Sequence, residues 1–432
     1  MVYSLCYDQK MDHALAWMHL RRSSVMRSAV ILAVLALTWM YQLLPSLHFF
    51  APLQLFGKNV YTVIPAVTMI TVFVLILPAI WRTPLTPVQA GGFIALLLMW
   101  LLVLGSRFAI FGDTIDVLRE RYLLLFFVYS AGLRYIAVDP TSRTALANVL
   151  IGALCFQAIF GILHTHLFPF IQVEPDSSGD LGVTVAQDEG SGETGTLLVR
   201  STFADVVVCG QFVLLAERRL PFTLRAAMMA VMFYAVGLSG ARYPQVWSAL
   251  LTAGLFINRK MDRAAPVALA VIVLAGMGMM LTGWTPFELQ SELRFDQDSG
   301  GRGEKLGLVT EVLSTYWPLS AFIGVPQSAA LSAITASGVV ISDDSYGEIA
   351  MDFGLTGLLL FMTCLLAWMV RWPLSILSTL MLLYFLSNLA ITNSILWDPW
   401  LFYFLVAWWL VYTATRGFRL GTPKTQTATT SQ

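Results

Sequence analysis

The sequence predicts an all-α membrane protein whose chain crosses the bilayer about twelve times. Of its 432 residues, 57% are hydrophobic and 12% are charged, whereas soluble domains carry about 25% charged residues. The mean hydropathy of +0.72 agrees with that composition. Apolar runs recur along the chain, each close to the ~20 residues that a helix needs to span the hydrocarbon layer. We therefore expect residues 1–432 to form a single integral membrane domain.

The apolar runs give the candidate spans in order along the chain. They cover residues 28–47, 60–80, 88–105, 121–138, 144–168, 200–216, 223–240, 243–258, 264–283, 354–371, 373–391 and 400–415. The stretch 223–258 is too long to cross the bilayer once as a single helix. A segment that contains Ser239, Gly240 and Pro244 interrupts it, so we divide it into two helices.

Basic residues in short loops predict the orientation, because loops on the cytoplasmic side carry an excess of Lys and Arg. With the N-terminus inside, basic clusters such as 21–22, 218–219 and 259–260 all fall on the inner side. Most acidic residues then fall outside. We expect both termini to lie in the cytoplasm.

Two outer loops are longer than usual. Residues 169–199 are rich in Gly, Ser and acids and are expected to be flexible. Residues 284–353 contain a Gly-rich turn, an amphipathic stretch from Glu304 to Trp317 and an acidic cluster. Loops of this length are usually functional or disordered, and the amphipathic stretch favours function. The tail at 420–432 is expected to be disordered.

Several basic residues lie at the outer side despite the positive-inside rule. Arg242 follows a helix break and Arg302 lies among glycines. Arg107 and Arg200 lie at outer membrane boundaries. A guanidinium offers a planar fork of donors that suits phosphate, so these residues could hold the pyrophosphate of a lipid-linked substrate. The alternative is that they extend to lipid headgroups or pair with nearby acids.

Three acids, Asp343, Asp344 and Glu348, stand just before an apolar span. Residues four apart share a helix face, so Asp344 and Glu348 could point together. One carboxylate could act as a general base, and a pair could hold a divalent cation. The alternative is a solvated helix start, where acids favour the helix dipole. No third carboxylate stands at a suggestive spacing, and we expect no metal.

Other classes of chemistry lack a motif in this sequence. The chain has four cysteines without a CxxC spacing, and it has no nucleotide-binding or metalloprotease fingerprint. The net charge is zero, so nothing points to nucleic acid. The predicted inner loops are too short for an ATPase or a nucleotide-sugar transferase domain. We expect no cofactor, and the energy for any reaction must arrive with the substrate.

An ordered set of motifs resembles the O-antigen polymerase and ligase superfamily of polysaccharide assembly. The set comprises SGAR at 239–242, Arg302 in its Gly-rich turn, PLSAFIG at 318–324, DDSY at 343–346 and DFGLTG at 352–357. The resemblance covers residues 200–370, and the rest matches by topology. Two departures stand out. Arg242 is displaced from its usual place beside the serine, and Asp343 stands where ligases have a histidine. The missing histidine weakens the ligase interpretation and is compatible with a Wzy-type repeat-unit polymerase. The length and the loop character resemble a polymerase of the xanthan type.

The resemblance implies a GT-C-like helical protein of the bacterial inner membrane that polymerises polyprenyl-pyrophosphate-linked oligosaccharides in the periplasm. The donor is the growing chain and the acceptor is the terminal sugar hydroxyl of a new unit. A flippase and chain-length or export proteins would be partners, together with membrane lipids. The alternatives are a glycan ligase, a secondary transporter or lipid flippase, and a non-enzymatic export scaffold.

The same resemblance implies roles for individual residues. Arg242 and Arg302 would stabilise the leaving pyrophosphate, and Asp343, Asp344 or Glu348 would accept the hydroxyl proton. The expected substrate-binding residues are Arg107, Arg200, Lys305, Tyr346 and Trp317.

Overall fold

The structure is a computed structural model. It describes residues 54–55, 58–59, 87–112, 130, 133, 140–167, 200–256, 302–326, 328–329, 345–369, 374–391 and 398–415. Several predictions lie outside these residues: the spans at 28–47, 60–80 and 264–283, nearly all of 121–138, the loop 169–199, the tail 420–432, and Asp343 and Asp344.

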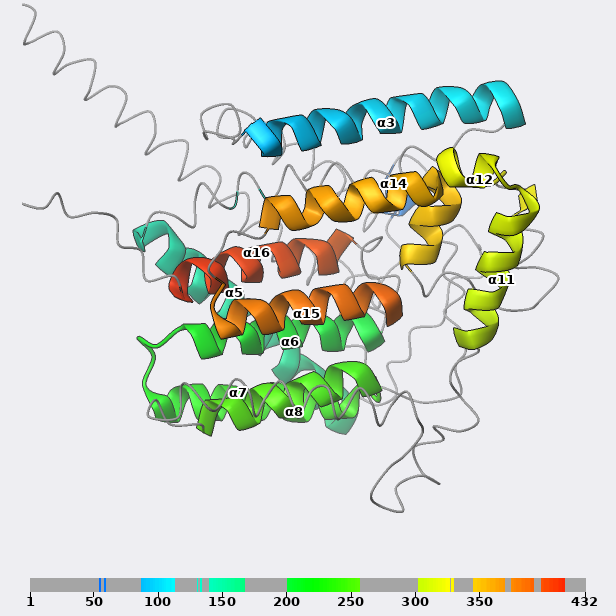
Figure 1. The fold of residues 1–432 in the computed structure, drawn as a ribbon. Helices are drawn as coiled ribbons and strands as arrows, with labels where there is room; N and C mark the ends of the chain where they lie inside the picture. Colours follow the sequence, from blue (N-terminus) through cyan, green and yellow to red (C-terminus); the bar gives the residue numbers. More distant parts are fainter. Residues whose placement is uncertain are drawn as a thin grey trace, which may run out of the picture.

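The described chain is almost entirely helical (Figure 1). Its helices are α3 (Pro87–Phe111), α5 (Pro140–Leu167), α6 (Arg200–Ala216), α7 (Phe222–Leu238), α8 (Arg242–Phe256), α11 (Arg302–Thr315), α12 (Leu319–Phe322), α14 (Ser345–Met369), α15 (Ile376–Ile391) and α16 (Asp398–Thr415). Two short strands, β1 (Gln54–Leu55) and β2 (Lys58–Asn59), pair antiparallel, with Gln54 opposite Asn59.

The length and composition of three helices suit a membrane protein. Ala90–Phe111, Thr141–Leu167 and Ser345–Met369 are each long and apolar enough to cross a bilayer. Large apolar side chains on α3, including Leu98 and Leu102, are more than half exposed. Such a surface suits lipid better than water. The described part of the chain is thus compatible with a helical membrane protein, while the twelve spans and their orientation stay predictions.

The stretch at 223–258 folds as two helices, as predicted. Ser239 ends α7 by donating its hydroxyl to the carbonyl of Val236 (2.6 Å), and it accepts the N–H of Ala241 (3.1 Å). Gly240 has φ +67, a conformation that glycine adopts without steric cost. The chain therefore reverses between α7 and α8 instead of continuing as one long helix.

Polar contacts at both ends show that α6 runs antiparallel to α5 and α7, which run in the same direction. At one end, Glu217 after α6 forms an ion pair with Arg143 of α5 (3.3 Å) and with Arg219. At the opposite end, His166 of α5 lies 2.9 Å from the hydroxyl of Tyr234 on α7. The basic residues of the first end belong to loops that the sequence predicts to be cytoplasmic.

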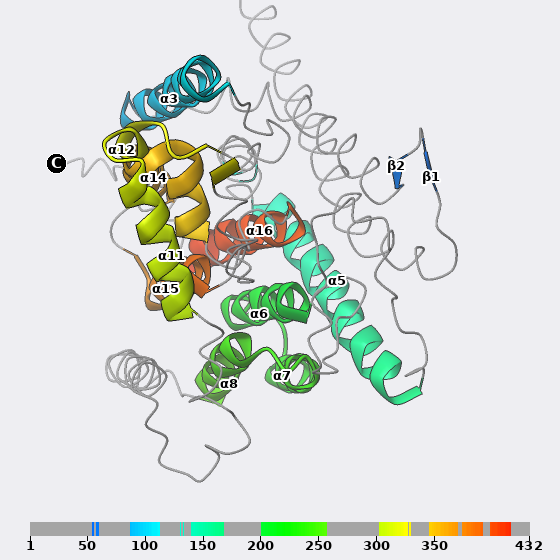
Figure 2. The ribbon, with the colours of Figure 1, turned by 90° about the vertical axis from the view of Figure 1, so that its right-hand side faces the viewer.

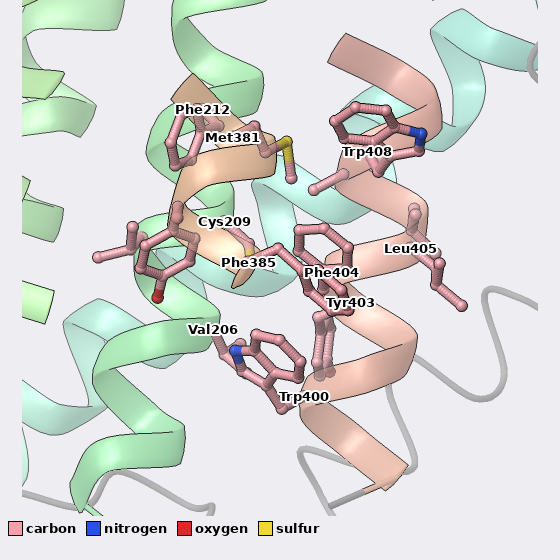
Figure 3. Packing of buried hydrophobic residues seen from close by; sticks show 14 of the residues in the cluster. Val206, Cys209, Phe212, Met381, Phe385, Trp400, Tyr403, Phe404, Leu405 and Trp408 are labelled. Carbon is pink, nitrogen blue, oxygen red and sulfur yellow. The ribbon is translucent and has the colours of Figure 1, made fainter. Parts of the chain in front are cut away.

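The core lies where α6, α15 and α16 meet (Figure 3). Phe385 of α15 stacks on Trp400 and Phe404 of α16, with ring centroids 5.6 and 4.3 Å apart. Residues 400–413 of α16 are all buried. Because a helix that is apolar all round needs partners on every side, α16 forms the centre of the bundle.

Helix α14 is broken in the middle. Gly354 has φ 76 and ψ 169, which are not helical angles. The predicted span at 354–371 corresponds to the part after the break, but the helix begins at Ser345. The first part contains Glu348 and Asp352, so a search for apolar runs passes over it.

Candidate functional site

The sequence-predicted site residues that the structure describes lie at one end of the bundle, which we call the α11–α12 end. At this end α3 finishes at Phe111, and α8 and α14 begin at Arg242 and Ser345. Figure 2 looks onto it and shows α11 and α12 lying in front of α14. The end that carries Arg143 and Glu217 lies on the opposite side of the bundle.

Helix α11 packs through one apolar face. Val309 and Val312 form a small core with Met351 of α14 and with Val325, which follows α12. Glu311 is exposed. The sequence predicts an amphipathic segment from Glu304 to Trp317; α11 covers Arg302–Thr315, and among its described side chains Val309 and Val312 are buried whereas Thr310 and Glu311 are exposed. Helix α11 is therefore tied to the first part of α14.

Two glycines let α12 and α14 approach at main-chain distance. Gly324 has φ +77, and a Cβ atom placed on it would lie 2.0 Å from the carbonyl oxygen of Met351. Gly354 has φ +76, and a Cβ atom there would lie 2.8 Å from the carbonyl carbon of Phe322. The N–H of Val325 donates to the Met351 carbonyl (2.7 Å). The segment at 318–325 thus closes directly over the break in α14.

Arg107 of α3 lies beneath this contact and is 1% exposed. Its Nη1 donates to the carbonyl of Asp352 (3.0 Å), and lies 3.4 Å from the carbonyls of Met351 and Ile323. A helix break frees carbonyls that need donors when they are buried. Sequence reasoning assigned Arg107 to the substrate, but in the structure its guanidinium contacts the protein main chain.

The start of α14 is anchored to α15. The hydroxyl of Tyr346 donates to the carbonyl of Leu386 (2.8 Å). Glu348, two residues further along α14, is 4% exposed. The alternative of a solvated helix start therefore does not describe Glu348, whose side chain points into the protein.

The start of α8 is anchored to the same part of α15. Tyr243 directly follows Arg242, and its hydroxyl donates to the carbonyl of Tyr384 (2.9 Å) and contacts the hydroxyl of Ser387. Tyr346 of α14 binds the carbonyl of Leu386 nearby. One stretch of α15 therefore brings together the segment that carries Arg242 and the segment that carries Glu348.

The other predicted residues that the structure describes lie at the same end. Trp317, between α11 and α12, has an exposed fraction of 64%. Arg302 is the first residue of α11 and Lys305 lies in its first turn, while Arg200 is the first residue of α6. The side chains of Arg200, Arg242, Arg302 and Lys305 fall outside the described part of the chain.

A buried carboxyl group, that of Asp205, is connected through Tyr384 to the start of α8. Asp205 of α6 is fully buried and accepts a hydrogen bond from the hydroxyl of Tyr384. The Tyr384 ring stacks on that of Tyr243, with centroids 5.7 Å apart. The sequence marks Asp205 as an acid inside a predicted span, but it does not identify the two tyrosines. The sequence does indicate that an acid inside a span needs a hydrogen-bond donor from a neighbouring helix, but it does not say which residue supplies it.

Among the described residues, no three His, Cys, Asp or Glu side chains gather in a way that could hold a metal ion. Comparison of the chain with protein-family models, with curated proteins and with solved structures finds no match.

Proposed function

We propose that this protein polymerises polyprenyl-pyrophosphate-linked oligosaccharide repeat units at the α11–α12 end. One observation carries the proposal. Tyr243 and Tyr346 both bind main-chain carbonyls in the same short stretch of α15. Their neighbours Arg242 and Glu348 supply the two functions that the reaction needs, a cation for the leaving group and a carboxylate for the proton.

The reaction forms one bond and breaks another. The acceptor hydroxyl oxygen bonds to the anomeric carbon of the donor, and the bond from that carbon to the pyrophosphate oxygen breaks. The pyrophosphate leaves as an anion and needs charge stabilisation rather than a proton. The hydroxyl proton passes to a carboxylate. Positioning of the two lipid-linked substrates supplies much of the remaining rate enhancement.

The residues divide between these tasks. Arg242 and Arg302 bind the pyrophosphate, and Arg200 and Lys305 add positive charge near it. Glu348 accepts the proton, with Asp343 and Asp344 as the other candidates. The exposed ring of Trp317 offers a stacking surface for sugar. Arg107 and the hydroxyl of Tyr346 are engaged with main-chain carbonyls, and so we give them no substrate contact.

The experiment uses purified protein in lipid nanodiscs with EDTA and the lipid-pyrophosphate-linked repeat unit of the host. Products are resolved by size on a gel. A ladder of repeat multiples supports the polymerase. Transfer of a single finished glycan to a lipid or protein acceptor would instead identify a ligase. An intact repeat unit without products would overturn both and favour a transporter, for which the buried Asp205 offers a site.

The variant Arg302→Gln tests the anion site. Its rate should fall on the order of 10²–10³-fold, the usual effect of removing one stabilising donor. Arg218→Gln is the matched control, because Arg218 is exposed and lies beside Glu217 and Arg219 at the opposite end. Normal polymer output from Arg302→Gln would show that Arg302 does not act on the pyrophosphate.

A further inference from the structure

The break in α14 is held by three elements that are distant in sequence. Arg107 comes from α3, the carbonyls of Met351 and Asp352 come from α14, and Ile323 and Gly324 come from the end of α12. The backbone of Gly324 lies so close to Met351 that no side chain fits between them. The segment at Ile323 and Gly324 therefore cannot shift against the break in α14 while Arg107 stays in place.

We propose that Arg107 is a positioning residue that fixes α11 and the first part of α14 relative to each other. The inference rests on the proposed function for its effect on catalysis. Arg107 is buried and donates to the carbonyl of Ile323, directly after α12, and to that of Asp352 in α14, so it acts through the main chain and does not touch the substrate. We call this arrangement the Arg107 joint.

The consequence follows from what the joint connects. The joint is connected to α11 by the apolar contacts of Val309 and Val312 with Val325 and Met351. The first residue of α11 is Arg302. The joint is connected to Glu348 by the main chain of α14, because Glu348 lies in the first turn of that helix. Loss of the joint would shift the leaving-group site relative to the carboxylate. A misplacement of about 1 Å in an active site can cost on the order of 10² in rate.

Arginine suits this place for a chemical reason. Its planar guanidinium carries five N–H donors and keeps its charge when buried. Lysine also donates to carbonyls, from a single ammonium group, so Arg107→Lys should keep part of the joint. Glutamine has only one amide group to donate, and Arg107→Gln should lose the joint.

The first readout of the joint is independent of activity. Spin labels are placed at Phe322 on α12 and at Leu359 on the second part of α14, which are 64% and 68% exposed. The background has its native cysteines replaced by alanine and is first shown to unfold at the same temperature as the wild type. We expect a narrow distance distribution in the parent, a broad one in Arg107→Gln, and an intermediate one in Arg107→Lys.

The glycines provide a second perturbation and a matched control. Gly324→Ala should broaden the same distribution, since its Cβ atom would collide with the Met351 carbonyl. Gly105→Ala lies on α3 two residues before Arg107, where a Cβ atom meets nothing within 4 Å. This control should match the parent in label distance and in polymer output.

Polymerisation rates then decide the positioning role. We expect Arg107→Gln and Gly324→Ala to lose on the order of 10² in rate, with partial recovery in Arg107→Lys. Unchanged label distances in Arg107→Gln would overturn the joint, and broad distances with normal rates would overturn its role in catalysis. If the parent makes no polymer, the proposed function fails, and the label distances alone still support or overturn the joint.

Discussion

The hydroxyl of Tyr384 donates a hydrogen bond to Oδ1 of Asp205, and this bond joins α15 to α6 inside the bundle. Asn388, one turn further along α15, is also fully buried. A buried carboxyl group without such donors would destabilise the fold. Because Tyr243 binds the main chain of Tyr384, the same contact also supports the start of α8.

We expect Tyr384→Phe to destabilise the protein by about 1–3 kcal/mol, because it removes a donor from a buried acceptor. Thermal unfolding in detergent measures the change. Tyr234→Phe is the control, because the hydroxyl of Tyr234 contacts His166 on the exposed surface; it should change stability by less than about 0.5 kcal/mol. Equal effects of the two substitutions would contradict a structural role for the Asp205 contact.

Gly354→Ala should destabilise the protein on the order of 1–3 kcal/mol, because alanine is strained at φ +76. The new methyl group would also meet the main chain of Phe322. Gly237→Ala in α7 should be neutral or slightly stabilising, since its Cβ atom meets nothing within 4 Å. The amount of each variant in the membrane and its unfolding temperature test this difference, and a stable Gly354→Ala variant would be the contrary result.

The positions of most described helices could be predicted from apolar runs. The runs at 200–216 and 400–415 correspond to α6, at Arg200–Ala216, and α16, at Asp398–Thr415. Run length is a strong signal because the thickness of the hydrocarbon layer fixes it. The first part of α14 escaped this signal, since Glu348 and Asp352 interrupt the run and tertiary packing buries the segment.

The Arg107 joint could not be predicted from sequence for a physical reason. The acceptors of Arg107 are main-chain carbonyls, and every residue type has one. The motifs that contain Gly324 and Gly354 were visible in the sequence. Their spacing does not reveal that each glycine lies against the main chain of the segment that contains the other. For the same reason the anchoring of Tyr243 and Tyr346 to α15 needed the structure.

Cysteine labelling tests the orientation that the basic loops predict. Ser314 of α11 and Arg218 are both exposed, at opposite ends of the bundle. In intact cells, an impermeant maleimide should label Ser314→Cys and should label Arg218→Cys only after the membrane is permeabilised. The reverse pattern would place the α11–α12 end in the cytoplasm and would exclude a periplasmic reaction there.

The exposed apolar side chains around α12 predict contact with the bilayer surface. Trp317 and Phe322 are each 64% exposed, and tryptophan favours the membrane interface. Brominated lipids should quench part of the protein fluorescence, and Trp317→Phe should reduce the quenched fraction. An unchanged fraction in that variant would place Trp317 away from the bilayer surface and would contradict this prediction.

Glu348→Gln separates the roles of the acids on the first part of α14. If Glu348 accepts the hydroxyl proton, the polymerisation rate should fall by about 10²–10⁴, the usual contribution of a general base. Asp352→Asn is the matched control, because Asp352 lies on the same helix, is partly exposed and binds Arg107 through its carbonyl, which the substitution preserves. A normal rate in Glu348→Gln would move the proton acceptor to Asp343 or Asp344, and equal losses in both variants would indicate that α14 had been disturbed rather than its base removed.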